Sequence, residues 1–433
     1  MTNLKLGSDL LDTSVSYASQ LDENDPIASL RSAFYLHKDV IYLDGNSLGL
    51  LSKPAEQAVL QMVEDWKIHG IDGWTDGTYP WFTLSETLSE KMAPLVGASA
   101  DEVIVTGSTT TNLHQLLATF YQPSSKRFAI LSEELSFPTD LYAIQSHLDL
   151  HAISHENGLR LIESKNGHRL DEEDILAALT DDVAVVILSS VLYRSGQLLN
   201  IEKLTKAAHE KGILVGFDLC HSIGSVPHQL HDWNVDFAFW CTYKHLNGGP
   251  GSVGGLFVHS KHHERLPGLR GWFGSDKQKQ FDMSSTFSKS SHAGAYQLGT
   301  PHLLSMAPLI GSLDLFADVG MDAVRKKSLQ LTTYLRDLIE HLPETQAFKV
   351  CTPYEDEQRG GHLLLEHPEA ARICKALKDH GVIPDFRSPN GIRIAPVALY
   401  NSFTDAHQCV QVLADCMKNK TYLQYENKRG VIA

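Results

Sequence analysis

The chain has 433 residues, more than one hydrophobic core usually organises, so we expect two domains. Its 42% hydrophobic and 21% charged content is that of an ordinary globular protein, and a net charge of -15 without a basic cluster argues against nucleic-acid binding. The first residues are polar and no run of about 18 apolar residues occurs, so we expect no secretory signal, no membrane span and a cytoplasmic location.

Two amphipathic helices are expected between about residues 54 and 97, because apolar residues recur there at helical spacing. The loop between them, residues 69–81, is rich in turn residues and carries two tryptophans. Such a loop is typical of a lid or of the wall of a pocket.

The middle of the chain alternates short apolar runs with helical segments. The runs are nearly continuous in apolar residues, which predicts strands of a sheet with both faces covered. Strands are expected at residues 102–106, 127–131, 183–188, 213–218 and 254–259, and helices at 112–121 and 201–211. This order predicts an α/β fold whose large domain contains a mostly parallel, doubly wound sheet.

The C-terminal third begins with a mostly helical stretch over residues 308–342, which is followed by alternating strands and helices. Strands are expected at residues 348–351, 362–366 and 391–395, and helices at 369–380 and 404–418. We expect a smaller α+β domain over residues 311–433, after a large domain over residues 51–310. Residues 1–50 are expected to form an N-terminal segment that packs with the small domain.

Two residues of the middle region indicate cofactor chemistry. Lys244 ends an apolar run and precedes a loop of small residues, a placement suited to covalent chemistry with a carbonyl. Asp218 ends the preceding apolar strand, where a carboxylate can hold a positive charge. Together they suggest a pyridoxal 5'-phosphate (PLP) enzyme, in which Lys244 carries the cofactor aldehyde and Asp218 faces the pyridine nitrogen. Each residue alone has an ordinary explanation, so the interpretation depends on the set.

The same region offers candidates for the phosphate and the ring of that cofactor. Residues 107–114 follow a strand and open a helix, where free N–H groups bind a phosphate dianion. Simple helix capping by Ser108 or Thr109 is the alternative explanation. Tyr243, beside the lysine, is placed to give its hydroxyl to the phosphate, and Phe137 offers a flat face to the ring.

Other functional motifs are not supported. The glycine-rich segment 248–255 lacks the Gly-Lys-Ser/Thr of a phosphate loop and precedes a strand. The histidines within 259–263 lack metal-type spacing, so no metal is expected. Residues 45–49 match Gly-x-Ser-x-Gly, but the next helix is expected only at about Pro54, too late for a nucleophile elbow. The six cysteines are scattered and are expected to be reduced and mostly buried.

Several long strings of this sequence resemble those of kynureninases, which are fold-type I PLP enzymes of the class V aminotransferase group. The strings that carry the resemblance lie at residues 42–49, 112–114, 137–140, 216–221, 232–238, 240–247, 271–274 and 389–396. The resemblance runs essentially end to end. It implies hydrolysis of L-kynurenine to anthranilate and L-alanine, with a place in the kynurenine pathway of tryptophan catabolism and in NAD biosynthesis.

The resemblance also implies a set of site residues. Lys244 and Tyr243 would transfer protons, and Asp218 would hold the pyridine nitrogen. The other cofactor contacts would be Thr109, Thr110, Phe137, Pro138, Thr139, Asp140, Ser189 and His221. Trp272 and Thr300 look like phosphate contacts that the neighbouring subunit supplies in this fold. A homodimer with active sites at the subunit interface is therefore expected.

For the substrate, a small amino acid, the resemblance implies a further group of contacts. Arg393 would pair with the α-carboxylate, for which its guanidinium fork is well suited. Trp74 and Thr300 match positions that line the aromatic-ring pocket, and Asn46 is placed among the substrate contacts. Family members that prefer 3-hydroxykynurenine tend to carry His and Asn at the positions of Trp74 and Thr300. We therefore expect this chain to prefer plain kynurenine.

The closest alternative is another class V PLP enzyme, such as a cysteine desulfurase or an aminotransferase. A desulfurase needs a nucleophilic cysteine on a mobile loop, and neither Cys351 nor Cys374 has such a setting. A non-catalytic PLP-fold protein would need an attached DNA-binding domain or a lost lysine, and neither feature is present in the sequence.

Overall fold

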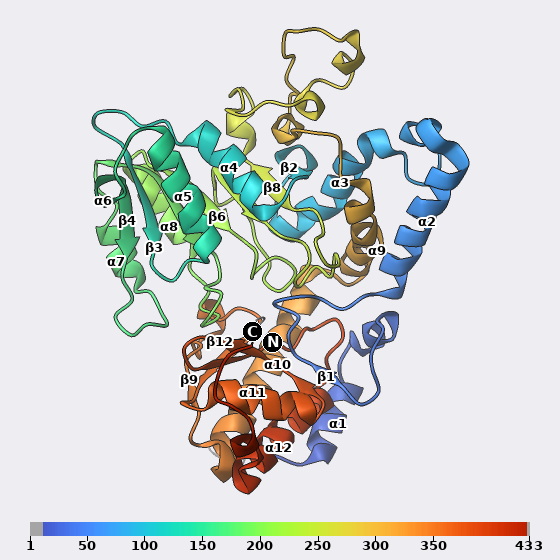
Figure 1. Ribbon diagram of the computed structural model, residues 1–433, viewed down its shortest axis with the longest axis vertical. Coiled ribbons are helices and arrows are strands. Elements are labelled where there is room, and N and C mark those ends of the chain that lie inside the picture. Colours follow the sequence, from blue (N-terminus) through green and yellow to red (C-terminus); the bar gives the residue numbers. More distant parts are fainter. Residues whose placement is uncertain (1–11, 431–433) are drawn as a thin grey trace.

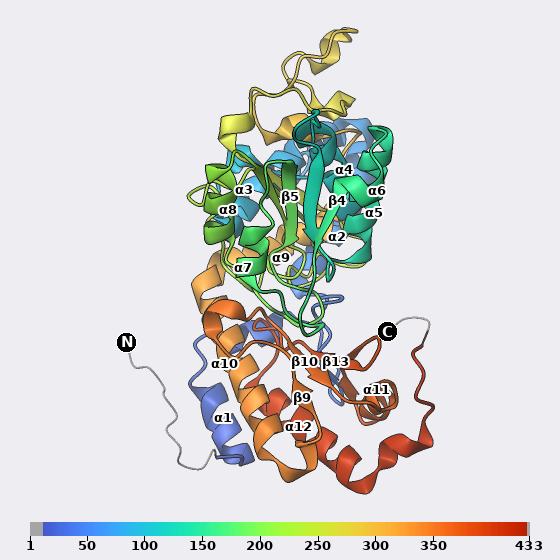
Figure 2. The same ribbon diagram turned by 90° about the vertical axis from the view of Figure 1, so that its left-hand side faces the viewer.

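The computed structural model describes residues 12–430 and divides them between two sheet-containing bodies (Figures 1 and 2). We call the part built on the seven-stranded sheet the large body and the part built on the four-stranded sheet the small body. The N-terminal helix α1 (Val15–Glu23) lies in the small body, beside the C-terminal helices. The described part of the chain therefore begins and ends in the same body.

The large sheet has the strand order β2-β8-β7-β6-β5-β3-β4 and is parallel except for β8, which runs antiparallel to both neighbours. Its strands are β2 (Val103–Val105), β3 (Ala129–Glu133), β4 (Leu159–Ile162), β5 (Val183–Ser189), β6 (Leu214–Asp218), β7 (Phe237–Trp240) and β8 (Gly255–Val258). The predicted α/β class with a mostly parallel sheet is confirmed. Strands β4 and β7 were not among the expected ones.

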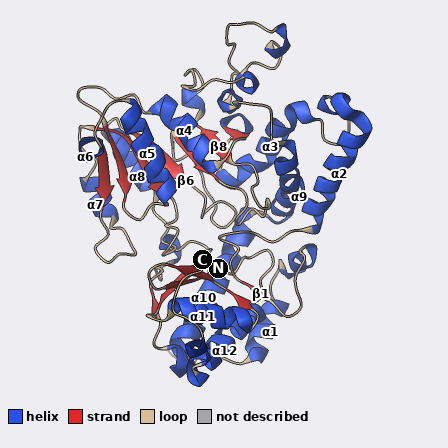
Figure 3. Ribbon diagram, in the orientation of Figure 1, coloured by secondary structure: helices blue, strands red, loops and turns tan. Residues whose placement is uncertain are grey.

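Helices cover both faces of the large sheet (Figure 3). They are α2 (Lys53–His69), α3 (Leu84–Val96), α4 (Thr109–Phe120), α5 (Pro138–Leu150), α6 (His155–Gly158), α7 (Glu172–Ala177), α8 (Ile201–Glu210) and α9 (Leu303–Val319). Helices α4 and α5 share one buried cluster with the sheet, and α3, α7 and α8 share the cluster on the other face. The two predicted helices between residues 54 and 97 correspond to α2 and α3.

Strand β7 shows how the sequence specifies this layered arrangement. Phe237 and Phe239 belong to the cluster under α4 and α5, whereas Ala238 and Trp240 belong to the opposite cluster. This alternation follows from the two-residue period of a strand. Gly216 of the neighbouring strand leaves the room that the Phe237 ring fills, since a Cβ there would lie 2.0 Å from a ring carbon.

The small body has the antiparallel strand order β12-β13-β10-β9 with helices packed against the sheet. Its elements are β9 (Lys349–Val350), β10 (Leu363–Glu366), β12 (Asp385–Arg387), β13 (Gly391–Ile394), α10 (Met321–His341), α11 (Ala370–Asp379) and α12 (Phe403–Asn419). A separate parallel pair joins β1 (Ile41–Tyr42) to β11 (Val382–Ile383). This pairing and α1 attach the N-terminal segment to the small body. The domain ranges 1–50, 51–310 and 311–433 remain our proposal, and residues 1–11 lie outside the described part.

The helical stretch predicted over residues 308–342 is two helices, α9 and α10, that meet at Gly320 with an 85° bend. Gly320 adopts φ +75°, which a glycine reaches without the steric cost that other residues bear. Within residues 12–430, no single helix is long and apolar enough to cross a membrane. The pair α9 and α10 meets that criterion only when the two are joined across their bend.

A buried ion pair fixes the N-terminal segment to the small body. Lys327 Nζ of α10 lies 2.7 Å from Asp25 Oδ2, and the two side chains are only 4% and 3% exposed. We predict that Lys327→Met lowers the free energy of unfolding by about 3–5 kcal/mol, because it leaves the Asp25 carboxylate buried without its cation. Denaturant unfolding of this variant and of Lys327→Met/Asp25→Leu tests this. A double variant as unstable as the single one would contradict the explanation.

Candidate active site

Lys244 lies just beyond β7, at the edge of the large body that faces the small body. Its Nζ is 2.7 Å from His221 Nε2 and 5.9 Å from the centre of the Phe137 ring. The loop before α2 covers the lysine segment, since the Gly49 N–H donates to the Tyr243 carbonyl at 2.7 Å. A side chain at Gly49 would collide with the Lys244 carbonyl oxygen, at 2.4 Å from a Cβ. The loop that contains Gly49 is thus packed directly against the backbone of Tyr243 and Lys244.

His221 is a neutral partner for this lysine. The side chain is buried, and burial, followed by the nearby charge of Lys244, holds the pKa of His221 well below its usual range. A neutral imidazole accepts a hydrogen bond from the Lys244 ammonium through Nε2, which leaves the ring proton on Nδ1. Nδ1 is buried and has no partner among the described residues. His221 therefore lies beside the Lys244 amine as an uncharged hydrogen-bond acceptor.

Three buried carboxylates lie at the carboxyl ends of the strands next to Lys244. Asp218 ends β6, Glu133 ends β3, and Asp140 stands in the first turn of α5. Burial and the adjacent charges of Asp218 and Glu133 raise the pKa of Asp140 well above its usual range. Because a positive charge beside buried carboxyl groups favours their ionised form, this cluster suits a cationic group in the space next to it.

Serine hydroxyls donate hydrogen bonds to one oxygen of the Glu133 carboxyl group in this cluster. Ser189 at the end of β5 and Ser136 both donate to Glu133 Oε1 at 2.8 Å. Glu133 Oε2 and Asp140 Oδ1 are buried without hydrogen-bond partners among the described residues. Ser189, predicted as a cofactor contact, therefore lies in this layer and bonds to a glutamate that the sequence analysis did not identify.

The first turn of α4 carries the remaining predicted cofactor contacts of the large body. Ser108 is the N-cap and accepts a hydrogen bond from the Thr111 N–H, so the capping explanation is correct for Ser108. The hydroxyls of Thr109 and Thr110 lie 3.7 Å from Cys220 Sγ and 3.1 Å from Thr139 Oγ1, respectively. These contacts join the start of α4 to the start of α5 and to the segment after β6. Capping and anion binding are compatible at one helix N-terminus.

Arg393 approaches the same region from β13 of the small body. Its buried guanidinium forms an ion pair with Asp385, with Nε 2.7 Å from Oδ2. Nη1 donates to the Tyr193 carbonyl at 2.6 Å, and Nη2 donates to the Ser47 hydroxyl at 2.9 Å. Tyr193 belongs to the large body, so this arginine bridges the crevice between the two bodies.

Asn46 stands in the loop beside Ser47 and has no local role that explains it. Its side chain is fully buried, and both amide atoms lack hydrogen-bond partners among the described residues. An unpaired buried amide is costly, so a polar group of a bound molecule is a suitable partner. Ser47 is not a nucleophile elbow, because the next α-helix begins only at Lys53.

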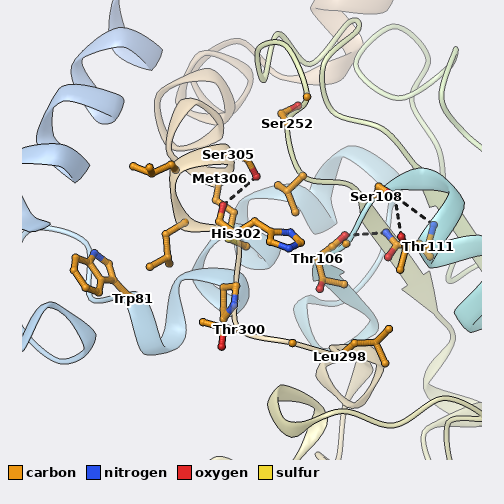
Figure 4. Close-up of a pocket in the computed structure, with 18 of the residues that line it drawn as sticks. Trp81, Thr106, Ser108, Thr111, Ser252, Leu298, Thr300, His302, Ser305 and Met306 are labelled. Atoms are coloured by element: carbon orange, nitrogen blue, oxygen red, sulfur yellow. Dashed lines mark hydrogen bonds between the residues drawn. The ribbon is translucent and has the colours of Figure 1, made fainter. Parts of the chain in front are cut away.

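The remaining predicted residues lie apart from Lys244 in a single chain. Trp74 and Thr300 line a separate cavity of about 890 Å³, together with Trp81 and the segment that leads into α4 (Figure 4). Lys244 is not part of the lining of this cavity. Trp272 is 45% exposed and packs against Phe281 at a ring distance of 5.3 Å. The structure therefore groups the large-body residues with Arg393 and separates Trp74, Thr300 and Trp272 from them.

Comparisons with known proteins identify the family of this chain. A sequence profile described as the kynureninase C-terminal domain matches residues 324–413. A curated kynureninase of Shouchella clausii is 60% identical over 417 residues, which cover 96% of this chain and 97% of that protein. A kynureninase of Geobacillus thermodenitrificans is 56% identical over 99% of this chain and 100% of that protein. The chain belongs to the kynureninase family.

Solved structures of PLP enzymes and their relatives share the fold of this chain. An apo cysteine desulfurase from Thermococcus onnurineus superposes with a TM-score of 0.76 at 18% identity, over 90% of this chain and 98% of that one. A C-DES variant with glycine covalently linked to its PLP cofactor gives 0.75 at 17% identity, over 88% and 98% of the two chains. These similarities establish the fold. The lysine, the buried carboxylates and the free helix N-terminus fit PLP, the cofactor of kynureninases.

The cysteines do not support the desulfurase alternative at the level of residues. All six are buried, and burial raises the pKa of Cys351 to about 12 and that of Cys374 still further. A desulfurase nucleophile must be an accessible thiolate. Cys220, close to Asp218, is likewise buried, and its pKa is raised well above the usual range.

Two site residues, Glu133 and Asp385, were not predicted. Glu133 ends a strand just as Asp218 does, so strand-end position was a usable signal. Asp385 lies on the short strand β12, eight positions before Arg393, and pairs with it only through the antiparallel register of β12 and β13. No short motif in the sequence marks that contact.

The ionisation of Glu133 should make the free energy of unfolding depend on pH. Burial raises its pKa from 4.5 to about 7, so between these pH values the folded chain holds a proton that the unfolded chain releases. Stability contributed by Glu133 therefore falls as pH rises through this window. We predict that Glu133→Gln stabilises the cofactor-free protein above pH 7 by on the order of 3 kcal/mol and has little effect below pH 4.5.

Thermal unfolding of the cofactor-free protein across this pH range measures the effect. Glu90→Gln, a change at an exposed glutamate of α3, serves as the control and should follow the parent at every pH. A difference between Glu133→Gln and the parent that does not grow with pH would show that burial of the charge is not its cause.

Proposed function

We propose that the Lys244 site catalyses hydrolytic cleavage of the Cβ–Cγ bond of L-kynurenine, giving anthranilate and L-alanine. The observation that carries the proposal is Lys244 Nζ at 2.7 Å from a neutral His221, beside the buried carboxylates Asp218 and Asp140. Membership of the kynureninase family supplies the substrate. A cytoplasmic location and a role in tryptophan catabolism and NAD biosynthesis remain predictions.

PLP, when bound, supplies an electron sink for negative charge that develops at the substrate Cα. Lys244 would hold the cofactor and then move the proton at Cα, with His221 Nε2 beside its amine. Asp218 would face the pyridine nitrogen and hold its positive charge, and Phe137 would cover the ring. Thr109, Thr110, Asp140 and Ser189, with Pro138 and Thr139 at the start of α5, would surround the cofactor.

The substrate would be oriented from the small body. Arg393 would bind the α-carboxylate, and Asp385 would keep the guanidinium plane fixed through its contact with Nε. Asn46 would supply a polar contact from the covering loop. Tyr243, whose hydroxyl carries a proton at neutral pH, would act in the second proton transfer.

Replacement of the lysine tests the proposal directly. We predict that Lys244→Ala folds but is colourless and loses at least about a thousandfold in kcat on L-kynurenine, because the proton-transfer group is gone. Anthranilate fluorescence and visible absorbance are the measurements. Lys203→Ala, at a surface ion pair with Glu173, is the matched control and should keep both. Full activity of Lys244→Ala would refute the assignment.

The ring pocket should favour the unsubstituted substrate. Trp74 and Thr300 offer a 3-hydroxyl group less polar partnership than His and Asn. We therefore predict a higher kcat/KM for kynurenine than for 3-hydroxykynurenine, and a ratio that shifts by at least about tenfold toward the hydroxylated substrate in Trp74→His/Thr300→Asn. Steady-state kinetics on both substrates gives the ratio. A parent enzyme that prefers the hydroxylated substrate would contradict the prediction.

We further propose that the active unit is a homodimer in which Trp272 and Thr300 serve the site of the other subunit. The segment between β8 and α9, drawn in yellow to olive, projects from the large body (Figures 1 and 2). Trp272 belongs to this segment of the chain. This segment exposes the large apolar side chains of Leu266, Leu269, Phe281 and Met283. Helix α2 and the residues after it expose a second apolar group, which consists of Leu60, Val63, Trp66, Ile68 and Ile71. Apolar patches of this kind mark protein–protein contacts, and a second copy would cover them.

Mixing two inactive variants tests whether Trp272 acts across the interface. A heterodimer of Lys244→Ala and Trp272→Ala subunits contains one intact site only if Trp272 comes from the other subunit. We predict that refolding an equal mixture restores about a quarter of the parental activity, since about half of the dimers are mixed. No recovery, with mixed dimers present by native mass spectrometry, would place Trp272 in the site of its own chain.

A further inference from the structure

A cluster of three metal-ligating side chains lies where the two bodies meet, away from Lys244. His168 belongs to the large body, in the segment between β4 and α7, while Cys351 and Glu366 belong to the small body. The neighbouring Arg169 fastens the two bodies here, with Nε 2.8 Å from the Cys351 carbonyl oxygen and Nη2 2.8 Å from the Thr352 carbonyl oxygen.

The donor atoms of this cluster converge on one point. His168 Nε2 is 3.1 Å from Glu366 Oε1, and the imidazole nitrogen, the Cys351 sulfur and the carboxylate oxygen all lie within 4.8 Å of one another. His168 and Cys351 are buried, whereas the Glu366 side chain is 19% exposed. The cluster is therefore enclosed on the protein side and reachable from solvent along the carboxylate.

Hydrogen bonding accounts for this arrangement only in part. The hydrogen bond from Cys351 Sγ to the Lys349 carbonyl is long, at 3.7 Å, and His168 Nδ1 is buried without a partner among the described residues. The other carboxylate oxygen of Glu366, Oε2, lies 3.4 Å from Lys349 Nζ at the exposed side of the cluster. At a comparable cluster, each oxygen of the buried Glu102 carboxylate already accepts two hydrogen bonds, one from His231 and one from a backbone N–H of Ser99 or Ser260.

We propose that His168, Cys351 and Glu366 bind a borderline-soft divalent cation of the Zn²⁺ type and thereby link the two bodies. Imidazole, thiolate and carboxylate are the donors that Zn²⁺ takes, at about 2.0–2.3 Å, which sets neighbouring donors about 3.3–3.6 Å apart in a tetrahedron. The His168–Glu366 distance of 3.1 Å is close to that spacing. The thiol proton leaves to solvent when the sulfur binds the metal, and a water takes the fourth position.

Such an ion would act on the relative placement of the two bodies. Lys244 lies on the large body and Arg393 on the small one, so an ion at this seam fixes the separation of the two groups without touching either. Since the ion binds the docked arrangement, it stabilises that arrangement by mass action. The inference does not depend on the reaction at Lys244.

Zinc binding to the PLP-loaded enzyme tests the proposal. After treatment with a chelator, the protein is dialysed against Zn²⁺, and metal content and Tm are measured for the parent and for Cys351→Ser, His168→Gln and Cys374→Ser. Cys374 is a buried thiol of α11 outside the cluster and is the matched control. We expect one Zn²⁺ per chain and a rise in Tm for the parent and the control, and a Kd at least about a hundredfold higher for the two cluster variants.

Cadmium provides a readout at the sulfur itself. With Cd²⁺, a thiolate charge-transfer band in the ultraviolet should form in the parent and in Cys374→Ser and be absent from Cys351→Ser. If Cys351→Ser fails to fold, the affinity of His168→Gln decides the question. Absence of stoichiometric binding to the parent, or equal affinity in the cluster variants and the control, would overturn the proposal. The Lys244→Ala variant should bind Zn²⁺ with the affinity of the parent.

Discussion

A group of buried carboxyl side chains at the carboxyl edge of the large sheet is the constraint that organises this candidate active site. Glu133, Asp140 and Asp218 are all buried there, and the cation close to them, Lys244, is bonded to a neutral histidine. Burial, followed by repulsion from Asp218 and Glu133, raises the pKa of Asp140 well above its usual range. A bound pyridinium would ease this strain, because its positive ring nitrogen would favour the ionised form of the acids beside it.

The fold explains why so many acids meet at one edge. Strands β3, β5 and β6 are parallel neighbours, so their last residues, Glu133, Ser189 and Asp218, lie side by side at the same end of the sheet. The helices that follow begin at that edge and present N–H groups and hydroxyls to it. The sheet thereby supplies anion-binding and cation-binding groups within a few ångströms of each other.

Local signals were sufficient to nominate the central residues of the candidate site, and the contacts that were missed are non-local. Asp218 and Lys244 each end an apolar run, and that pattern depends only on neighbouring residues. The break between α9 and α10 at Gly320 was missed, because helical spacing continues on both sides of it. The pairing of Asp385 with Arg393 depends on strand register, and the contact of His168 with Glu366 depends on how the two bodies dock. Neither contact has a sequence-local cause.

Arg393 shows how the seam between the bodies bears on substrate binding. A guanidinium has five N–H groups in a rigid fork, and Asp385, the Tyr193 carbonyl and Ser47 already occupy three directions around it. A substrate carboxylate that binds two N–H groups must therefore displace the Tyr193 carbonyl or the Ser47 hydroxyl, since the Asp385 pair is buried and costly to break. Tyr193 lies on the large body and Ser47 on the covering loop, so in the proposed role of Arg393 the carboxylate would replace a contact between these parts of the chain with a contact to substrate. Substrate recognition and the docking of the two bodies would then be coupled through one side chain.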